Sequence, residues 1–122
     1  MSWIVEGAES ESGRVVANGQ CVRFLQEIGG LPHTSQWRPG EKVRGSNCEP
    51  GTCIATFDPS GRYGNHTDGR SHAAILIAET AQGLLVVDQW VGHPVQRRTI
   101  RYRNGVGRKV NDGDAYHVIE EE

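Results

Sequence analysis

Cys21 is the side chain whose type and position best suit covalent chemistry. Cysteine attacks as a thiolate, so its ordinary pKa of about 8.5 must fall if the thiolate is to form near neutral pH. Apolar residues follow Cys21 at spacings of three, four and seven, which predicts a helix over about 20–28 with Asn18 as its N-cap. Cys21 then lies in the first helical turn, where unpaired N–H groups and the helix dipole stabilise an anion.

A nucleophilic cysteine needs a proton acceptor, and His72 is the candidate among five histidines. His72 precedes the continuous apolar run Ala73–Ile77, which is typical of a buried strand. A polar side chain at the mouth of such a strand can line a cleft. We expect His72 to act as the base of Cys21, with a structural, hydrogen-bonded histidine as the alternative.

The third group should come from the strand beside His72. Residues 71–90 predict a β-hairpin around a turn at 81–82, which brings Asp88 close to Ala74 and to the side of His72. A carboxylate there would accept the Nδ1–H of the imidazole and stabilise its cation. The sequence therefore predicts Cys21, His72 and Asp88 as a catalytic triad.

Two neighbours of Asp88 qualify this prediction. Gln89 points to the opposite sheet face if the strand is regular, but a one-residue bulge would exchange it with Asp88. Gln89 therefore stays the alternative third residue. Trp90 would shield the contact between Asp88 and His72 from water, or serve as an ordinary core tryptophan.

One helix followed by strands predicts an α+β domain with an antiparallel sheet of about five strands. We expect a single domain over 1–122 and loops at 31–51, 58–70 and 91–96. The predicted strands are Thr52–Phe57, Ser71–Glu79, Leu84–Trp90, Arg97–Tyr102 and Ala115–Ile119.

The composition argues against membrane and nucleic-acid functions. The 122 residues are 36% hydrophobic and 23% charged, with a formal net charge of −2, and no apolar run approaches the roughly 20 residues that a membrane helix needs. The N-terminus has no secretory signal pattern. A local basic stretch predicts a solvated strand face, with an anionic groove contact as the alternative. Its members are Arg97, Arg98, Arg101, Arg103, Arg108 and Lys109.

Cys48 and Cys53 flank a Pro-Gly turn signal, so a disulfide between them is a candidate. A zinc-binding module is one alternative function, with Cys48, Cys53, His66 and His72 as ligands. The cysteine spacing is wider than that of a usual first pair, and no second compact pair exists. Another alternative is a non-catalytic binding domain in which Cys21 is an inert core residue.

Four segments resemble the papain-like cell-wall hydrolases, the NlpC-type and CHAP amidases. Asn18–Val22 is similar to their nucleophile segment, and Glu49–Phe57 to the strand before their histidine. Ser71–Leu76 resembles their His-x-Ala-Ile strand, and Asp88–Trp90 the polar-x-Trp segment with the third catalytic residue. The resemblance covers about 15–120, and the order of the segments is more specific than any one of them.

This resemblance implies a cysteine amidase or endopeptidase that cleaves peptidoglycan stem peptides without a cofactor or metal. The Cys21 N–H would hold the oxyanion, with Gln20 and Gln89 as auxiliary candidates. Trp37, Tyr63, His66 and Trp90 are candidates for the substrate groove, and packing is the alternative for Trp37. The bond that is cut stays open among the glycan-to-L-Ala amide, the D-Glu-to-diaminopimelate bond and the diaminopimelate-to-D-Ala crosslink.

A single-domain chain of this kind also resembles the amidase effectors of bacterial type VI secretion. That implies a toxin that is cytoplasmic in its producer, is delivered into a rival's periplasm and is opposed by a cognate immunity protein. Such delivery would explain the missing signal peptide. An oxidising periplasm would suit a Cys48–Cys53 disulfide.

Overall fold

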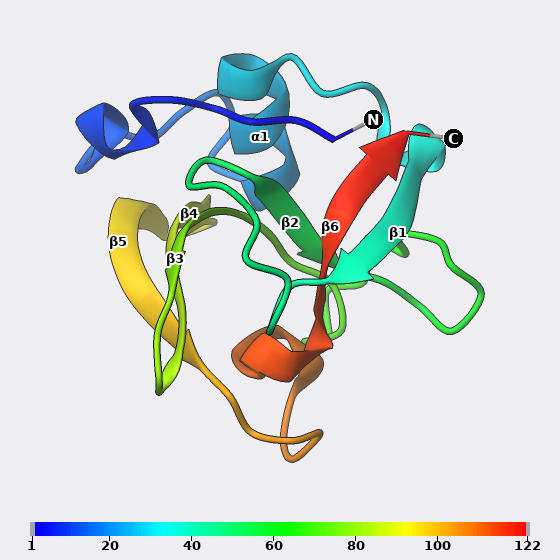
Figure 1. Ribbon diagram of the computed structural model, residues 1–122. Coiled ribbons are helices and arrows are strands. Elements are labelled where there is room, and N and C mark those ends of the chain that lie inside the picture. Colours follow the sequence, from blue (N-terminus) through cyan, green and yellow to red (C-terminus); the bar gives the residue numbers. More distant parts are fainter. Residues whose placement is uncertain (1, 122) are drawn as a thin grey trace.

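A twisted, six-stranded antiparallel sheet carries one α-helix on one of its faces (Figure 1). The structure is a computed structural model that describes residues 2–121. The strands follow the order β1-β6-β2-β3-β4-β5 across the sheet. They are β1 (Trp37–Lys42), β2 (Cys53–Thr56), β3 (Ala73–Glu79), β4 (Gly83–Trp90), β5 (His93–Arg101) and β6 (Tyr116–Glu121). The helices are α1 (Cys21–Gly29) and the short 3-10 turns η1 (Ala8–Glu11), η2 (Thr34–Gln36), η3 (Lys109–Asn111) and η4 (Gly113–Ala115).

The alternation of side chains along the strands divides the core into two clusters. Ala73 and Ile75 of β3 pack in the cluster that also contains Phe24 and Leu25 of α1. Ala74 and Leu76, the intervening residues, belong to a second cluster with Tyr116 of β6. Both faces of β3 are buried over residues 73–76, which explains the continuous apolar run at the start of this strand. The prediction of a buried strand here is confirmed.

The hairpin of β3 and β4 contains a β-bulge that decides which side chain meets His72. Near the turn Glu79 pairs with Leu84 and Ala78 with Leu85. The register shifts by one residue between Ala78 and Leu76, so that Leu76 pairs with Val86. The shifted register, continued past the pair Ile75–Val87, places Asp88 opposite Ala74. Without the bulge Gln89 would take that place and face. We predicted Asp88 for a regular strand and Gln89 for a bulged one, and this reason was wrong, because the bulge is what brings Asp88 to this place.

The predicted sheet lacked one strand. The segment 37–42 contains Pro39 and Gly40, which we interpreted as a loop, but it forms β1 at the sheet edge beside β6. Proline is tolerated on an edge strand because its missing N–H removes no interior ladder bond. The other edge strand, β5, likewise contains Pro94. No helix among residues 2–121 is long and apolar enough to cross a membrane.

The prediction of α1 was right about which side of the helix faces the core and wrong about the residue that caps its N-terminus. The helix runs from Cys21 to Gly29, one residue later at each end than expected, and Gly30 follows with a positive φ of 69°. The N-cap is Gln20, which makes no side-chain capping bond. Asn18, two residues before the N-cap, instead accepts the Gln20 N–H with its side-chain oxygen at 3.1 Å.

Candidate active site

Cys21 is the first residue of α1, so its backbone N–H has no acceptor within the helix. The buried amide of Gln89 fixes the approach to this helix. Its Oε1 accepts the Val16 N–H at 2.9 Å, and its Nε2 donates to the carbonyls of Val16 at 2.8 Å and Gln20 at 3.0 Å. Gln89 therefore holds the start of α1 on the sheet and does not face the imidazole of His72.

His72 lies just before β3, where its backbone is tied to Thr56 of β2. The His72 N–H donates to the Thr56 Oγ1 at 3.0 Å, and the Thr56 N–H donates to the His72 carbonyl at 3.0 Å. The ring Nε2 lies 2.7 Å from Oδ2 of Asp88, a fully buried carboxylate. We predicted this contact at Nδ1, and that detail was wrong. Because Asp88 occupies Nε2, Nδ1 is the ring nitrogen left for Cys21.

The electrostatics of this group favour a thiolate beside an imidazolium. Burial alone raises the pKa of Cys21, but the hydrogen bond and charge of His72, followed by the Ala73 N–H and Tyr63, outweigh it and hold the pKa below the ordinary value. Burial alone lowers the pKa of His72, yet Asp88 and then Cys21 raise it to about 9. Opposite shifts of this kind are expected of an ion pair between a thiol and an imidazole.

Arg98 of β5 completes the surroundings of Asp88 and was not singled out from the sequence. Its Nη2 donates to Asp88 Oδ2 at 2.7 Å, and its Nε lies 3.0 and 3.1 Å from the two carboxylate oxygens. Burial raises the pKa of Asp88, but His72 and Arg98 together hold it below the usual value. We had interpreted Arg98 as part of a solvated basic face. The missed signal is that a buried aspartate needs a countercharge from an adjacent strand.

Tyr63 lies against the sulfur of Cys21, whereas Trp37 lies behind Tyr63. The Tyr63 hydroxyl is 3.8 Å from Cys21 Sγ, and burial together with Cys21 raises the tyrosine pKa, so the hydroxyl stays a donor. Trp37 is fully buried, its ring centroid is 5.1 Å from that of Tyr63, and its Nε1–H donates to the Pro32 carbonyl. The groove interpretation of Trp37 was therefore wrong, and its packing alternative describes its place.

A hollow of about 350 Å³ lies beside His72 and includes two of the predicted groove residues. Trp90 meets the His72 ring edge-on at 6.0 Å, and the Arg98 guanidinium lies 4.6 Å above the Trp90 ring. His66 also lines the hollow, with its Nε2 2.9 Å from Asp58 Oδ2. Trp90 thus contacts His72 and Arg98, and His66 lines the same hollow, whereas the role of Trp90 as a shield stays a prediction.

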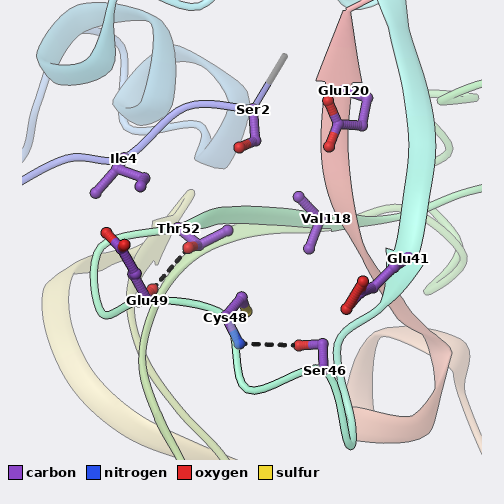
Figure 2. Close-up of a pocket in the computed structure, with 9 residues that line it drawn as sticks. All are labelled: Ser2, Ile4, Glu41, Ser46, Cys48, Glu49, Thr52, Val118 and Glu120. Atoms are coloured by element: carbon purple, nitrogen blue, oxygen red, sulfur yellow. Dashed lines mark hydrogen bonds between the residues drawn. The ribbon is translucent and has the colours of Figure 1, made fainter.

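The candidate disulfide is not formed: Cys48 and Cys53 are free thiols that pack against clusters on different faces of the sheet. Cys53 is buried in the cluster beneath α1, and Cys48 packs against the cluster on the other face. Figure 2 shows Cys48 in a separate hollow with Val118 and Glu49, where its N–H donates to Ser46 Oγ at 3.2 Å.

The four ligands of the zinc alternative are not brought together either. Residues 2–121 contain no group of three or more His, Cys, Asp or Glu side chains arranged to hold a metal ion. His66 is paired with Asp58, and His72 with Asp88.

Comparison with known proteins places this arrangement in a family. Residues 2–119 match the model of the family described as "Dae2: Domesticated amidase effector 2". The chain belongs to the domesticated amidase effector 2 family. A relative in Salmonella typhi, named "Type VI secretion amidase effector 2 protein", is 36% identical over 126 aligned positions that cover 93% of each protein.

Two further members of this similarity group agree with the assignment. A protein of Ixodes scapularis named "Domesticated amidase effector 2" is 38% identical over 108 positions, covering 83% of this chain and 70% of the relative. The solved structure titled "Type 6 secretion amidase effector 2 (Tae2)" superposes with a TM-score of 0.83 at 34% identity, covering 98% of this chain and 94% of that one. The α+β architecture is therefore shared with a solved relative.

Proposed function

We propose that the chain is a cysteine amidase that cleaves amide bonds in peptidoglycan stem peptides. The observation that carries this proposal is the line of three groups: a thiol at the start of α1, an imidazole beside it, and a buried carboxylate 2.7 Å from the far nitrogen of that imidazole. The names of the relatives support the amidase reaction. The order of the three residues supports the papain-like, NlpC-type and CHAP classification that we also propose.

In the proposed mechanism the Cys21 thiolate attacks the carbonyl carbon of the amide and forms a tetrahedral oxyanion. The unpaired Cys21 N–H at the helix start donates to that oxyanion. Protonated His72 gives its Nδ1 proton to the leaving amine, so that the C–N bond breaks and a thioester remains. Neutral His72 then takes a proton from water, which attacks the thioester and releases the acid and Cys21.

The surrounding residues hold this geometry. Asp88 keeps the His72 ring oriented and stabilises its cation, and Arg98 keeps Asp88 ionised. Tyr63 and the Ala73 N–H stabilise the thiolate before attack. Gln89 supports the site by fixing the backbone that leads into Cys21.

We further propose that the enzyme is an antibacterial effector whose target is the cell wall of a rival bacterium. The name of the Salmonella typhi relative supports delivery by a type VI secretion system. Delivery to the rival's periplasm and a cognate immunity protein in the producer belong to this proposal. The Ixodes scapularis relative indicates that the same domain is also used outside that setting.

The test is digestion of purified cell-wall sacculi, with mass spectrometry of the released fragments. Wild-type protein should release peptides with one new amine and one new carboxyl end, and the masses identify the bond that is cut. Cys21→Ala should release none, whereas the matched thiol variant Cys48→Ala should digest as wild type does. Equal digestion by Cys21→Ala would contradict the proposal.

A further inference from the structure

The hollow beside His72 has several basic side chains in its lining. Arg98 and Arg108 line it together with His66 and His72, and none of the described residues in its lining is an Asp or Glu. Cys21 does not line the hollow, but His72 does, and the His72 ring also contacts Cys21, which is the attacking group of the proposed function. Groups bound in it would therefore lie on the substrate close to the scissile bond.

Arg108 is held in this lining by a close approach to Gly69. A Cβ atom on Gly69 would lie only 2.7 Å from Arg108 Cδ and 3.2 Å from its Cγ, and Gly69 has a positive φ of 92°. The aliphatic stem of Arg108 thus lies across a position that only glycine leaves open. The Val110 N–H donates to the Gly69 carbonyl at 3.2 Å and links the two loops.

The loop that carries Arg108 is also attached to the sheet. The Lys109 ammonium donates to the carbonyl of Phe57, which follows β2. The Asn111 N–H donates to the Arg108 carbonyl at 3.0 Å, which closes the turn η3. These bonds fix the backbone of Arg108 although its side chain is exposed.

The two arginines of the hollow differ in their partners. The Arg98 guanidinium donates three hydrogen bonds to the carboxylate of Asp88. Arg108 forms no ion pair with any carboxylate in the described part of the chain, 2–121. The stem of Arg108 is packed on Gly69 in a lining without carboxylates, and its guanidinium keeps free donors. Such a group is suited to bind an anion, and its planar fork matches a carboxylate.

We propose that Arg108 is a specificity-determining residue that binds a free carboxylate of the peptide substrate. The proposal rests on the proposed function and names its substrate class: acidic peptides that retain a carboxylate beside the scissile amide. Stem peptides have this chemistry, because D-Glu and diaminopimelate each keep a free carboxylate when one of their carboxyl groups is in an amide. Arg98 adds positive charge to the hollow but keeps its hydrogen bonds to Asp88.

The experiment compares Arg108→Gln with wild type on soluble stem-peptide fragments, and on the same fragments with each carboxylate converted in turn to the neutral amide. For wild type, amidation of one particular carboxylate should raise KM on the order of tenfold, the usual scale for losing a partly exposed charged hydrogen bond. Arg108→Gln should raise KM similarly on the unmodified fragment, with kcat within about twofold. The KM of Arg108→Lys should lie between those of wild type and Arg108→Gln.

The decisive result is the combination of the two changes. If Arg108 binds that carboxylate, amidation should have little additional effect on Arg108→Gln, because the interaction is already lost. The matched control is Arg101→Gln, an exposed arginine of β5 outside the hollow, which should keep the wild-type KM. Additive effects, an unchanged KM in Arg108→Gln, or an equal rise in Arg101→Gln would each overturn the proposal.

A binding readout separates this proposal from the proposed function. Calorimetry with the Cys21→Ala variant measures fragment affinity without turnover, and adding Arg108→Gln should weaken it on the order of tenfold. If wild type cleaved no fragment while this weakening was observed, the proposed function would fail and the carboxylate site would stand. If cleavage occurred and affinity did not depend on Arg108, the carboxylate site would fail alone.

Discussion

Cys21 and Cys53 both pack in the cluster between α1 and the sheet, yet the pKa values of their thiols shift in opposite directions. Burial raises the pKa of Cys53 to about 12, and no partner offsets it among the causes that act on that thiol. Burial opposes ionisation of Cys21 as well, but His72, the Ala73 N–H and Tyr63 reverse the shift. The difference shows that the neighbours of a buried thiol, and not burial alone, decide the direction in which its pKa shifts.

The largest expected effect comes from removing each thiol in turn. Cys21→Ala should lower the rate of fragment release on the order of 10⁴-fold or more, because no other group forms the thioester. Cys53→Ala should keep the rate within about threefold and lower the free energy of unfolding by about 1 kcal/mol, the scale of a small core truncation. Cleavage rates on sacculi and thermal melts of both variants measure these two effects. Comparable cleavage rates in Cys21→Ala and Cys53→Ala would contradict a special role for Cys21.

His72→Ala should make Cys21 resemble Cys53. Without the imidazolium the burial of Cys21 is no longer offset by its main partner, so its pKa should rise above the ordinary value. Cleavage should fall on the order of 10⁴-fold. Alkylation of the thiol as a function of pH measures the shift.

The matched control for that change is His66→Ala. His66 also binds a carboxylate, Asp58, at 2.9 Å, but it does not contact Cys21 among the described hydrogen bonds. Its loss should leave the pH dependence of alkylation unchanged. If the pH dependence of alkylation shifted in His66→Ala, or did not shift in His72→Ala, then His72 would not be the group that stabilises the Cys21 thiolate.

Asp88→Asn should move the alkaline side of the pH–rate profile. Asp88 is the main group that raises the pKa of His72 to about 9, so a neutral amide should lower that pKa by about one unit or more. The protonated acid needed for the leaving amine would then be lost at lower pH. The rate at neutral pH should fall about 10²- to 10⁴-fold, less than for Cys21→Ala. An unmoved alkaline limb would mean that Asp88 does not set the His72 pKa.

The pKa shifts also determine a stability trend. The folded pKa of His72 is raised, so its contribution to stability is complete below its unfolded pKa of about 6.5 and is lost as the pH rises through about 9. In Asp88→Asn this contribution should shrink. Urea unfolding at several pH values would show the difference from wild type above neutrality.

The smallest effect is expected for Arg98→Gln. Loss of the guanidinium should raise the pKa of Asp88 and loosen its carboxylate, with a decrease in rate of about tenfold. Asp88 has a lowered folded pKa, so its contribution to stability is present above about pH 4 and is lost as the pH falls. Acid unfolding should therefore begin at higher pH in Arg98→Gln, and Arg97→Gln, at a neighbouring exposed position, is the control.

The sequence was informative wherever periodicity or residue order determines a contact. The apolar spacing after Cys21 predicted α1 and its inward face, and the apolar run after His72 predicted β3. The hairpin turn at 81–82 gave the approximate partners of β4. These features are local, so single-sequence patterns contain them.

The remaining details depend on tertiary structure. The choice between Asp88 and Gln89 follows from the bulge between Leu76 and Ala78, which no spacing in the sequence specifies. The partnership of Arg98 depends on the pairing of β5 with β4, and the separation of Cys48 from Cys53 depends on which face each occupies. The Pro-Gly turn signal between Cys48 and Cys53 does not specify which face of the sheet each thiol occupies.

The most direct test of the account is alkylation of the native protein by iodoacetamide at about pH 6, well below the ordinary thiol pKa. Mass spectrometry of peptides would follow the three cysteines separately. The account predicts stoichiometric modification of Cys21 with parallel loss of cleavage, while Cys53 reacts only after unfolding. If Cys21 stays unmodified until the protein is denatured, or reacts no faster than Cys48, it is not the nucleophile.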